Sequence, residues 1–149
     1  MAAVRGQFVI VVGCGRLGSY LANRLSNDGA SVVAVDCDEK AFDALTAEYS
    51  GFRVEGDATE FAVLKQAKTD RADVVIAATQ DDNVNTMIVQ VARKVFHVPK
   101  AIARVVEPQR VELCKALGIE CICPTSFGSD MVLRSLQERP PGPAERGQV

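Results

Sequence analysis

Residues 8–18 read Phe8-Val9-Ile10-Val11-Val12-Gly13-Cys14-Gly15-Arg16-Leu17-Gly18. The apolar run predicts a buried strand, and it leads directly into a turn that contains three glycines. A second apolar run, over residues 31–35, ends on Asp36. The order of strand, glycine turn, helix, strand and acid is typical of a Rossmann fold that grips an adenine dinucleotide. It predicts a nucleotide site where the glycine turn and Asp36 meet.

Each part of this pattern has a physical reason. Gly13 permits a tight turn, and Gly15 leaves no Cβ in the way of a phosphate that approaches the main chain. Gly18 lets the first helix lie close to the sheet, and the start of that helix offers unpaired N–H groups to phosphate oxygens. Asp36, 18 residues beyond Gly18, accepts hydrogen bonds from both hydroxyls of a ribose. The pattern also fits a Rossmann-like fold whose nucleotide site is vestigial.

Apolar runs and amphipathic stretches alternate along the whole chain. This alternation predicts an α/β fold, a Rossmann-like doubly wound sheet of six parallel strands with helices on both faces, plus a C-terminal helix. We expect strands near residues 8–12, 31–36, 52–55, 73–78, 101–105 and 120–123. We expect helices near residues 16–28, 39–49, 60–68, 82–96, 107–117 and 125–138.

The length of 149 residues fits one domain, which we expect to span residues 1–138. Residues 139–149 are rich in proline and carry almost nothing apolar, so they predict a disordered tail or a linker. The last helix has a broad apolar surface, and two placements for it stay open. It packs on its own sheet, or it reaches a neighbouring subunit. Its apolar residues are Phe127, Met131, Val132, Leu133 and Leu136.

Composition limits the class of protein. The formal net charge is −2, without a cluster of Lys or Arg, so we expect no nucleic-acid partner. The N-terminus leaves no room for a signal peptide before the first strand, and no apolar run approaches the ~20 residues of a membrane span. Five cysteines without CxxC spacing predict a reduced, cytoplasmic protein rather than a disulfide framework or a zinc site. Cys14 and Cys37 flank the predicted nucleotide site, which leaves a redox-sensing role open.

Three further motifs follow predicted strands: Gly56-Asp57-Ala58-Thr59, then Ala78-Thr79-Gln80-Asp81-Asp82-Asn83 with Asn85, and Ile102-Ala103-Arg104-Val105. Together with the glycine turn and Asp36, they resemble the N-terminal domain of potassium-uptake regulators, which comprise the Trk system subunit and RCK (regulator of K+ conductance) domains. The resemblance covers roughly residues 7–138. This combination is far more specific than the glycine turn alone.

The resemblance implies a cofactor-binding set and a role for most of its members. The three glycines form the phosphate turn, Arg16 and Arg104 contact phosphates, and Asp36 holds the adenosine ribose. Asp57 and Ala58 border the adenine, and Thr79 lines the site. From the residues alone, a solvated Arg16, a helix-capping Asp57 and a salt-bridged Arg104 stay open. The complete set is Gly13, Gly15, Arg16, Leu17, Gly18, Asp36, Asp57, Ala58, Thr79 and Arg104.

The acids Asp81 and Asp82 predict an acidic helix start rather than a metal site. Some relatives carry a cation-binding acid after the last strand, where this chain reads Pro124-Thr125-Ser126, so we expect no metal. Asp36, Cys37 and Asp38 place negative charge where the 2′-phosphate of NADP would lie, which disfavours NADP. NAD(H) and the adenine nucleotides ATP, ADP and AMP stay equally open.

The resemblance implies a cytoplasmic regulatory (gating) subunit of a potassium uptake system, peripherally associated with the inner face of the cell membrane. Such a subunit transmits its nucleotide-bound state to an integral-membrane potassium transporter or channel. It implies a homo-oligomer, a dimer or a ring of dimers, possibly with a related second subunit. Many relatives carry a further C-terminal ligand-sensing domain.

An NAD-dependent oxidoreductase and a redox-sensing dinucleotide-binding protein are the alternatives. Hydride transfer needs a proton donor or acceptor beside the nicotinamide. The one histidine, His97, falls between a predicted helix and a predicted strand, and neither Tyr20 nor Tyr49 has a lysine four residues on. We therefore expect no enzyme. A DNA-binding repressor is disfavoured because no helix-turn-helix or basic surface is evident.

Overall fold

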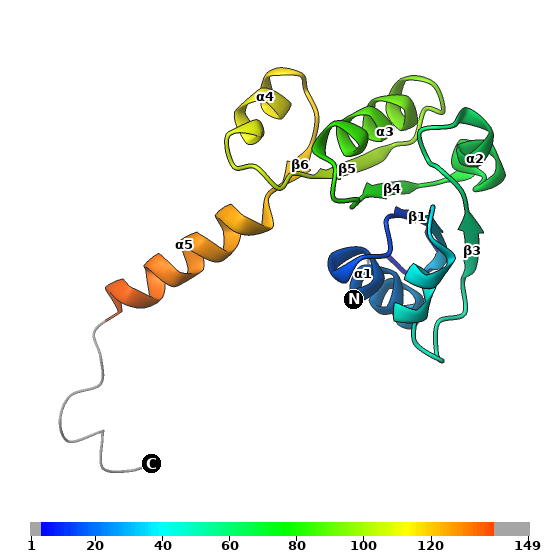
Figure 1. The fold of residues 1–149 in the computed structure, drawn as a ribbon, viewed down its shortest axis with the longest axis horizontal. Helices are drawn as coiled ribbons and strands as arrows, with labels where there is room; N and C mark the ends of the chain where they lie inside the picture. Colours follow the sequence, from blue (N-terminus) through cyan, green and yellow to red (C-terminus); the bar gives the residue numbers. More distant parts are fainter. Residues whose placement is uncertain (1–3, 139–149) are drawn as a thin grey trace, which may run out of the picture.

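A single parallel sheet of six strands organises the computed structural model, which describes residues 4–138 (Figure 1). The strand order is β3-β2-β1-β4-β5-β6, and every neighbouring pair is parallel. This order reverses direction between β1 and β4, as in a doubly wound Rossmann sheet. The prediction of six parallel strands is confirmed. The strands are β1 (Phe8–Val12), β2 (Ser31–Asp36), β3 (Phe52–Glu55), β4 (Val74–Ala77), β5 (Lys100–Arg104) and β6 (Cys121–Ile122).

Helices cover both faces of this sheet, as predicted. Helix α1 (Arg16–Asn27) and the 3-10 helix η2 (Glu39–Ala44) pack on one face. The other face carries three helices, because the crossovers that follow β3, β4 and β5 run in the opposite direction along the sheet. These three are α2 (Phe61–Gln66), α3 (Asp82–Lys94) and α4 (Arg110–Ala116).

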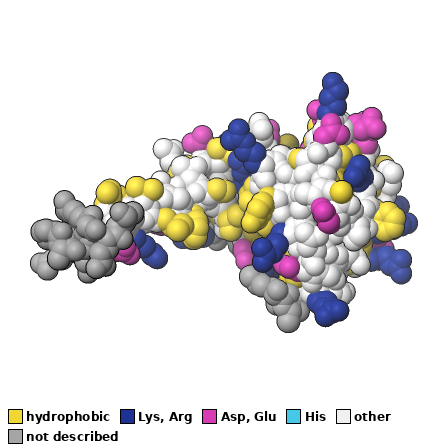
Figure 2. All heavy atoms as spheres, turned by 90° about the horizontal axis from the view of Figure 1, so that it is seen from below, with side chains coloured by type: hydrophobic (Ala, Val, Ile, Leu, Met, Phe, Trp, Pro, Cys, Tyr) yellow, Lys and Arg dark blue, Asp and Glu magenta, His cyan; other side chains and the backbone are white. Residues whose placement is uncertain are grey.

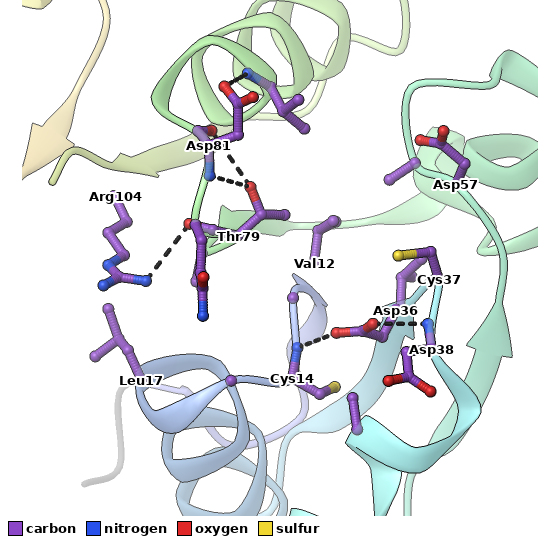
Figure 3. A pocket seen from close by; sticks show the side chains of 18 of the residues that line it. Val12, Cys14, Leu17, Asp36, Cys37, Asp38, Asp57, Thr79, Asp81 and Arg104 are labelled. Atoms are coloured by element: carbon purple, nitrogen blue, oxygen red, sulfur yellow. Dashed lines mark hydrogen bonds between the residues drawn. The ribbon is translucent and has the colours of Figure 1, made fainter.

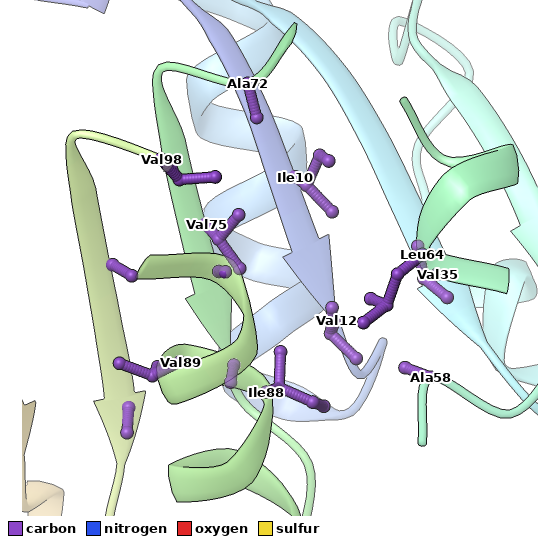
Figure 4. Close-up of a cluster of buried hydrophobic side chains, with 14 of the residues drawn as sticks. Ile10, Val12, Val35, Ala58, Leu64, Ala72, Val75, Ile88, Val89 and Val98 are labelled. Atoms are coloured by element: carbon purple, nitrogen blue, oxygen red, sulfur yellow. The ribbon is translucent and has the colours of Figure 1, made fainter. Parts of the chain in front are cut away.

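The sequence of β1 is apolar throughout because this strand lies at the centre of the sheet and is covered on both faces. Ile10 and Val12 pack into the cluster under α2 and α3, whereas Val9 and Val11 pack into the cluster under α1. Successive side chains of a strand point to opposite faces, so a strand covered on both sides buries every residue. Figure 4 shows the first of these clusters, in which Ile10 and Val12 lie among Val75, Ile88 and other aliphatic side chains.

The helix expected over residues 39–49 is wrong in both type and length. Only Glu39–Ala44 is helical, and it is a 3-10 helix. The side chain of Asn23, on α1, donates to the carbonyl of Ala44 and accepts from the N–H of Thr46. These two bonds pair a main-chain carbonyl and a main-chain N–H that further helical turns would otherwise have paired. The chain then leaves the helix in an extended conformation at Leu45.

Other boundaries moved by a few residues. The stretch expected as one helix over residues 60–68 is α2 followed by a separate 3-10 turn, η3 (Thr69–Arg71). The helix expected over residues 107–117 begins only at Arg110 and ends at Ala116. Gly29 and Gly118 follow helices with positive φ angles of 91° and 68°, the left-handed conformation in which glycine commonly ends a helix.

The final helix, α5 (Pro124–Gln137), projects away from the domain body (Figure 1). None of its residues is buried, so the placement in which it packs on its own sheet is wrong. Figure 2 shows hydrophobic side chains along this projection and near its base. Among residues 4–138, no helix combines the length and apolar character needed to cross a membrane. The tail predicted over residues 139–149 lies outside the described residues.

Candidate functional site

A cavity of about 1010 Å³ opens at the carboxyl ends of the central strands (Figure 3). Doubly wound folds bind ligands at this edge, beside the point where the strand order reverses. Nine of the ten predicted cofactor-binding residues line the cavity. The tenth, Gly18, lies beneath it against the glycine turn. The nine are Gly13, Gly15, Arg16, Leu17, Asp36, Asp57, Ala58, Thr79 and Arg104.

The three glycines of the turn meet different constraints. Gly13 has a φ of +95°, and a Cβ there would lie 2.8 Å from the main chain of Ala78 and Thr79. A Cβ on Gly18 would lie 1.6 Å from the carbonyl oxygen of Gly13. A Cβ on Gly15 would meet nothing within 4 Å. The fold therefore requires glycine at positions 13 and 18. At position 15 the fold would accept a side chain, and glycine there only keeps the cavity open next to the main chain.

The start of α1 faces the cavity without a cap. Gly15 is the N-cap residue, and within residues 4–138 no side chain accepts from the first N–H groups of the helix. Those groups carry the positive end of the helix dipole. Arg16 is exposed at the same end and adds a full positive charge. This end of the cavity is thus equipped for an anion such as phosphate.

Asp36 lies at the end of β2, and both of its carboxylate oxygens already accept a main-chain hydrogen bond. Oδ2 accepts from the N–H of Cys14 at 2.8 Å, and Oδ1 accepts from the N–H of Asp38 at 2.9 Å. The side chain therefore fastens the glycine turn to β2, a role that the sequence analysis missed. Each carboxylate oxygen keeps a further lone pair, so Asp36 retains capacity to accept from ribose hydroxyls.

The two cysteines at this site differ in exposure. Cys14 is buried, and burial raises the pKa of its thiol to about 12, with the Asp36 carboxylate adding to the rise. Cys37 is exposed and lines the cavity. A thiol that stays protonated is a poor nucleophile, so Cys14 is not suited to redox sensing at neutral pH.

The loop after β3 forms the far side of the cavity. Oδ1 of Asp57 accepts from the N–H of Thr59 at 2.8 Å and from its hydroxyl at 2.7 Å. These two bonds lower the pKa of Asp57. The interpretation of Asp57 as the helix cap is wrong, because the N-cap residue of α2 is Glu60. Ala58 is buried in the core and lines the cavity from below the loop.

Asn85 ties together the loops that follow β4 and β5. Its Oδ1 accepts from the N–H of Thr79 at 2.9 Å and from the Thr79 hydroxyl at 2.6 Å. Its Nδ2 donates to the carbonyls of Thr79 and Arg104, both at 2.9 Å. Asn85 is completely buried. The sequence carried a signal for this role, since Asn85 occupies the buried stripe of α3 that continues through Ile88, Val89 and Ala92.

The acids that begin α3 have structural partners. Asp81 is the N-cap residue, and its side chain accepts from the N–H groups of Asn83 and Val84, as an acidic helix start predicts. Asp82 is 7% exposed and accepts from the N–H groups of Val106 and Glu107. Asp82 therefore holds the loop after β5 against α3.

Arg104 reaches the cavity from the end of β5. Its Nη1 donates to the carbonyl of Thr79 at 3.5 Å, and its Nε is buried without a partner. In the described part of the chain it forms no ion pair, so the interpretation of Arg104 as a salt-bridged surface residue is not supported. Among the described residues that line the cavity, Arg16 and Arg104 are the two basic ones.

The strand order, the uncapped helix start and the acid at the end of β2 define a Rossmann-like domain with an open cleft at the carboxyl ends of its strands. The chain belongs to the TrkA-N domain family, whose model matches residues 9–124. It is similar to the Trk system potassium uptake protein TrkA of Streptomyces coelicolor, with 34% identity over 86% of this chain and 57% of that protein.

Two further comparisons agree with this membership. The chain is 32% identical to a Trk system potassium uptake protein TrkA homolog of Methanothermobacter thermautotrophicus, over 89% of this chain and 61% of that protein. It superposes on the structure of GsuK bound to ADP with a TM-score of 0.74 and 25% identity, over 91% of this chain and 35% of that one. The chain thus spans about three fifths of the length of these curated relatives.

Proposed function

We propose that the cavity binds an adenine nucleotide, either NAD(H) or one of AMP, ADP and ATP. The single observation that carries the proposal is that the uncapped start of α1 and the Asp36 carboxylate lie side by side in one open cavity. One feature suits phosphates and the other suits a ribose. The ADP-bound GsuK structure, to which this chain is similar, supports the same class of ligand.

Each part of the nucleotide has a place in this proposal. The phosphates lie against the N–H groups at Gly15 and beside the Arg16 guanidinium, with Arg104 reaching them from the opposite side. The ribose hydroxyls donate to the free lone pairs of Asp36. The adenine lies between the turn after β2 and the loop at Asp57 and Ala58. Asp36 and Asp38 place two carboxylates at the ribose end, which disfavours the 2′-phosphate of NADP.

The proposed role is regulatory. We place the protein in the cytoplasm, at the inner face of the cell membrane, as a gating subunit of a potassium uptake system whose transporter or channel subunit spans the membrane. Asn85 and Asp82 couple the loops after β4 and β5, so a ligand that contacts Thr79 and Arg104 acts on both loops. A nucleotide shifts the conformation of such a subunit only by binding its two conformations with different affinity.

We propose that α5 assembles the protein into a homo-oligomer, a dimer or a ring of dimers. Five of its large apolar side chains are between 56% and 76% exposed, and no residue of the helix is buried against the domain. An exposed apolar surface of this kind marks an interaction site. The five are Phe127, Met131, Val132, Leu133 and Leu136.

Hydride-transfer catalysis is the second candidate function, and the chemistry of the cavity disfavours it. None of the described lining residues is a histidine, tyrosine or lysine, the usual proton carriers beside a nicotinamide. His97, with a φ of 56°, follows α3 and does not line the cavity.

Thermal-shift titration tests the nucleotide proposal. ADP, AMP, ATP or NADH at about 100 times its dissociation constant adds about 2.7 kcal/mol to the free energy of unfolding. We expect a raised melting temperature with at least one of these ligands and a smaller shift with NADPH. The Asp36→Asn variant keeps one acceptor oxygen but loses the charge, and we expect its ligand-induced shift to fall. No shift with any adenine nucleotide would refute the proposal.

A further inference from the structure

A second cavity lies at the opposite edge of the sheet, at the amino-terminal ends of β1, β2 and β3. Its volume is about 580 Å³, within the range of small-molecule pockets. It shares no lining residue with the nucleotide cavity. Its lining residues are Phe8, Ser31, Val32, Val33, Phe52, Arg53, Val54, Gln66, Ala67, Lys68 and Arg71.

The short helix α2 explains why this cavity is open. A helix of six residues is only about 9 Å long, so it covers a limited part of the strands beneath it. Val33 and Val54 belong to the core cluster on the α2 face, which places this cavity on the same face. Phe52, two residues before Val54 on the same strand face, is 77% exposed despite its aromatic ring. The exposed apolar surface of the cavity is therefore the Phe52 ring, whereas Val33 and Val54 are buried.

Two exposed cationic residues, Lys68 and Arg71, line the same cavity. Lys68 and Arg71 lie in the turn that joins α2 to β4, and no carboxylate is among the described lining residues. Within residues 4–138 neither side chain forms an ion pair. Arg53 also lines the cavity, but strand alternation places its side chain on the opposite face from Val54.

Hydrogen bonds fix the turn that carries these two cations. The Thr69 hydroxyl is fully buried and donates to the carbonyl of Leu64 at 2.6 Å. The N–H of Arg71 donates to the carbonyl of Lys68 at 2.9 Å. Lys68 itself has a φ of 62°, a conformation that few residues with side chains adopt. The main-chain positions of Lys68 and Arg71 are thus set by the fold, and their exposed side chains extend from them.

We propose that this cavity binds a small organic anion with an apolar body, such as a medium-chain or aromatic carboxylate. The carboxylate pairs with Lys68 and Arg71, and the apolar body covers the half-buried Phe8 and the exposed Phe52. Charge complementarity selects an anion, since the rim offers two cations and no acid. The exposed Phe52 ring selects an apolar body, since its burial removes apolar surface from water.

Displacement of a fluorescent probe tests this proposal on the whole chain. Anilinonaphthalene sulfonate is an aromatic anion that brightens in apolar surroundings. We expect it to bind and to be displaced by decanoate, with decanol displacing it about tenfold less well because it lacks the charge. Saturating ADP is expected to leave the probe bound, because the two cavities are separate.

Matched variants assign the probe to this cavity rather than to the apolar surface of α5. The pair Lys68→Gln and Arg71→Gln is expected to weaken decanoate binding about tenfold. Lys65→Gln, on the adjoining helix α2 but outside the cavity, is the control and is expected to change nothing. Absence of binding, equal potency of decanol and decanoate, or equal affinity in the two sets of variants would each overturn the proposal. Circular dichroism establishes that all variants are folded.

Discussion

Replacing Gly15 by alanine separates what the ligand requires from what the fold requires. The added Cβ would meet no protein atom within 4 Å, and the φ of Gly15, −72°, is one that alanine adopts freely. Loss of glycine flexibility in the unfolded chain stabilises by about 0.4–1 kcal/mol. Alanine is a poorer N-cap residue than glycine, and this difference lowers the free energy of unfolding by a similar amount. The free energy of unfolding of Gly15→Ala should therefore stay within about 1 kcal/mol of the parent.

Nucleotide binding by the same variant should fall sharply. In the proposed complex a phosphate contacts the main chain at Gly15, and the methyl group would occupy part of that space. Loss of one charge-assisted hydrogen bond costs about 1.5–3 kcal/mol, a factor of about 10 to 100 in affinity. Isothermal titration calorimetry with ADP and NADH measures this change directly.

Gly18→Ala makes the same chemical change three residues away with the opposite expected result. Its Cβ would lie 1.6 Å from the carbonyl oxygen of Gly13, so α1 must move away from the turn. Overpacking of this kind costs about 3 kcal/mol, which lowers the melting temperature by about 10 °C. Gly128→Ala, in the exposed helix α5 with no neighbour within 4 Å, is the control without overpacking, and it should not lower the melting temperature. Unchanged ADP affinity in a folded Gly15→Ala variant would show that no phosphate contacts the main chain at Gly15.

Four further predictions rest on other contacts in the structure. Asn85→Leu leaves the partners of a buried amide unsatisfied and should lower the free energy of unfolding by about 3 kcal/mol in urea titrations; an unchanged midpoint would contradict this. At pH 8, iodoacetamide should modify exposed Cys37 and spare Cys14, read by mass spectrometry. Because the pKa of Cys14 rises from 9.0 to about 12 on folding, its contribution to stability is full below pH 9 and is lost toward pH 12; Cys14→Ala should flatten that decline. Leu133→Asp should reduce the sedimentation coefficient if α5 joins subunits, whereas exposed Lys115→Asp should not.

The sequence of β1 and the glycine turn predicted the fold because local and global demands agree there. An apolar run buried on both faces and a turn that requires glycine leave few alternatives. The site residues were also predictable in position, since parallel strands bring the loops after them to one edge. Their hydrogen-bond partners were not predictable. The bond from the N–H of Cys14 to Asp36 joins residues 22 apart, and no local pattern encodes it.

Tertiary contacts decided the features that the sequence left open or mispredicted. Residues 39–49 carry helix-like spacing of Phe42, Leu45 and Tyr49, yet the chain becomes extended at Leu45. The Tyr49 hydroxyl then lies within hydrogen-bond distance of the carbonyls of Val32 and Phe52. The side chain of Asn23 bonds the Ala44 carbonyl and the Thr46 N–H, which a longer helix would have bonded within itself. Propensity is a weak guide where such distant side chains compete. The apolar residues of α5 likewise left its placement open, and the structure leaves them exposed.

A structure of the protein with bound ADP would locate the nucleotide. We expect ribose oxygens within hydrogen-bond distance of the Asp36 carboxylate and phosphate oxygens at the N–H groups of Gly15 and Arg16. We also expect the hydrogen bond from the N–H of Cys14 to Asp36 to persist in the complex. ADP bound elsewhere on the chain, or an empty cleft at saturating ADP and NADH, would show that the cleft is not the nucleotide site.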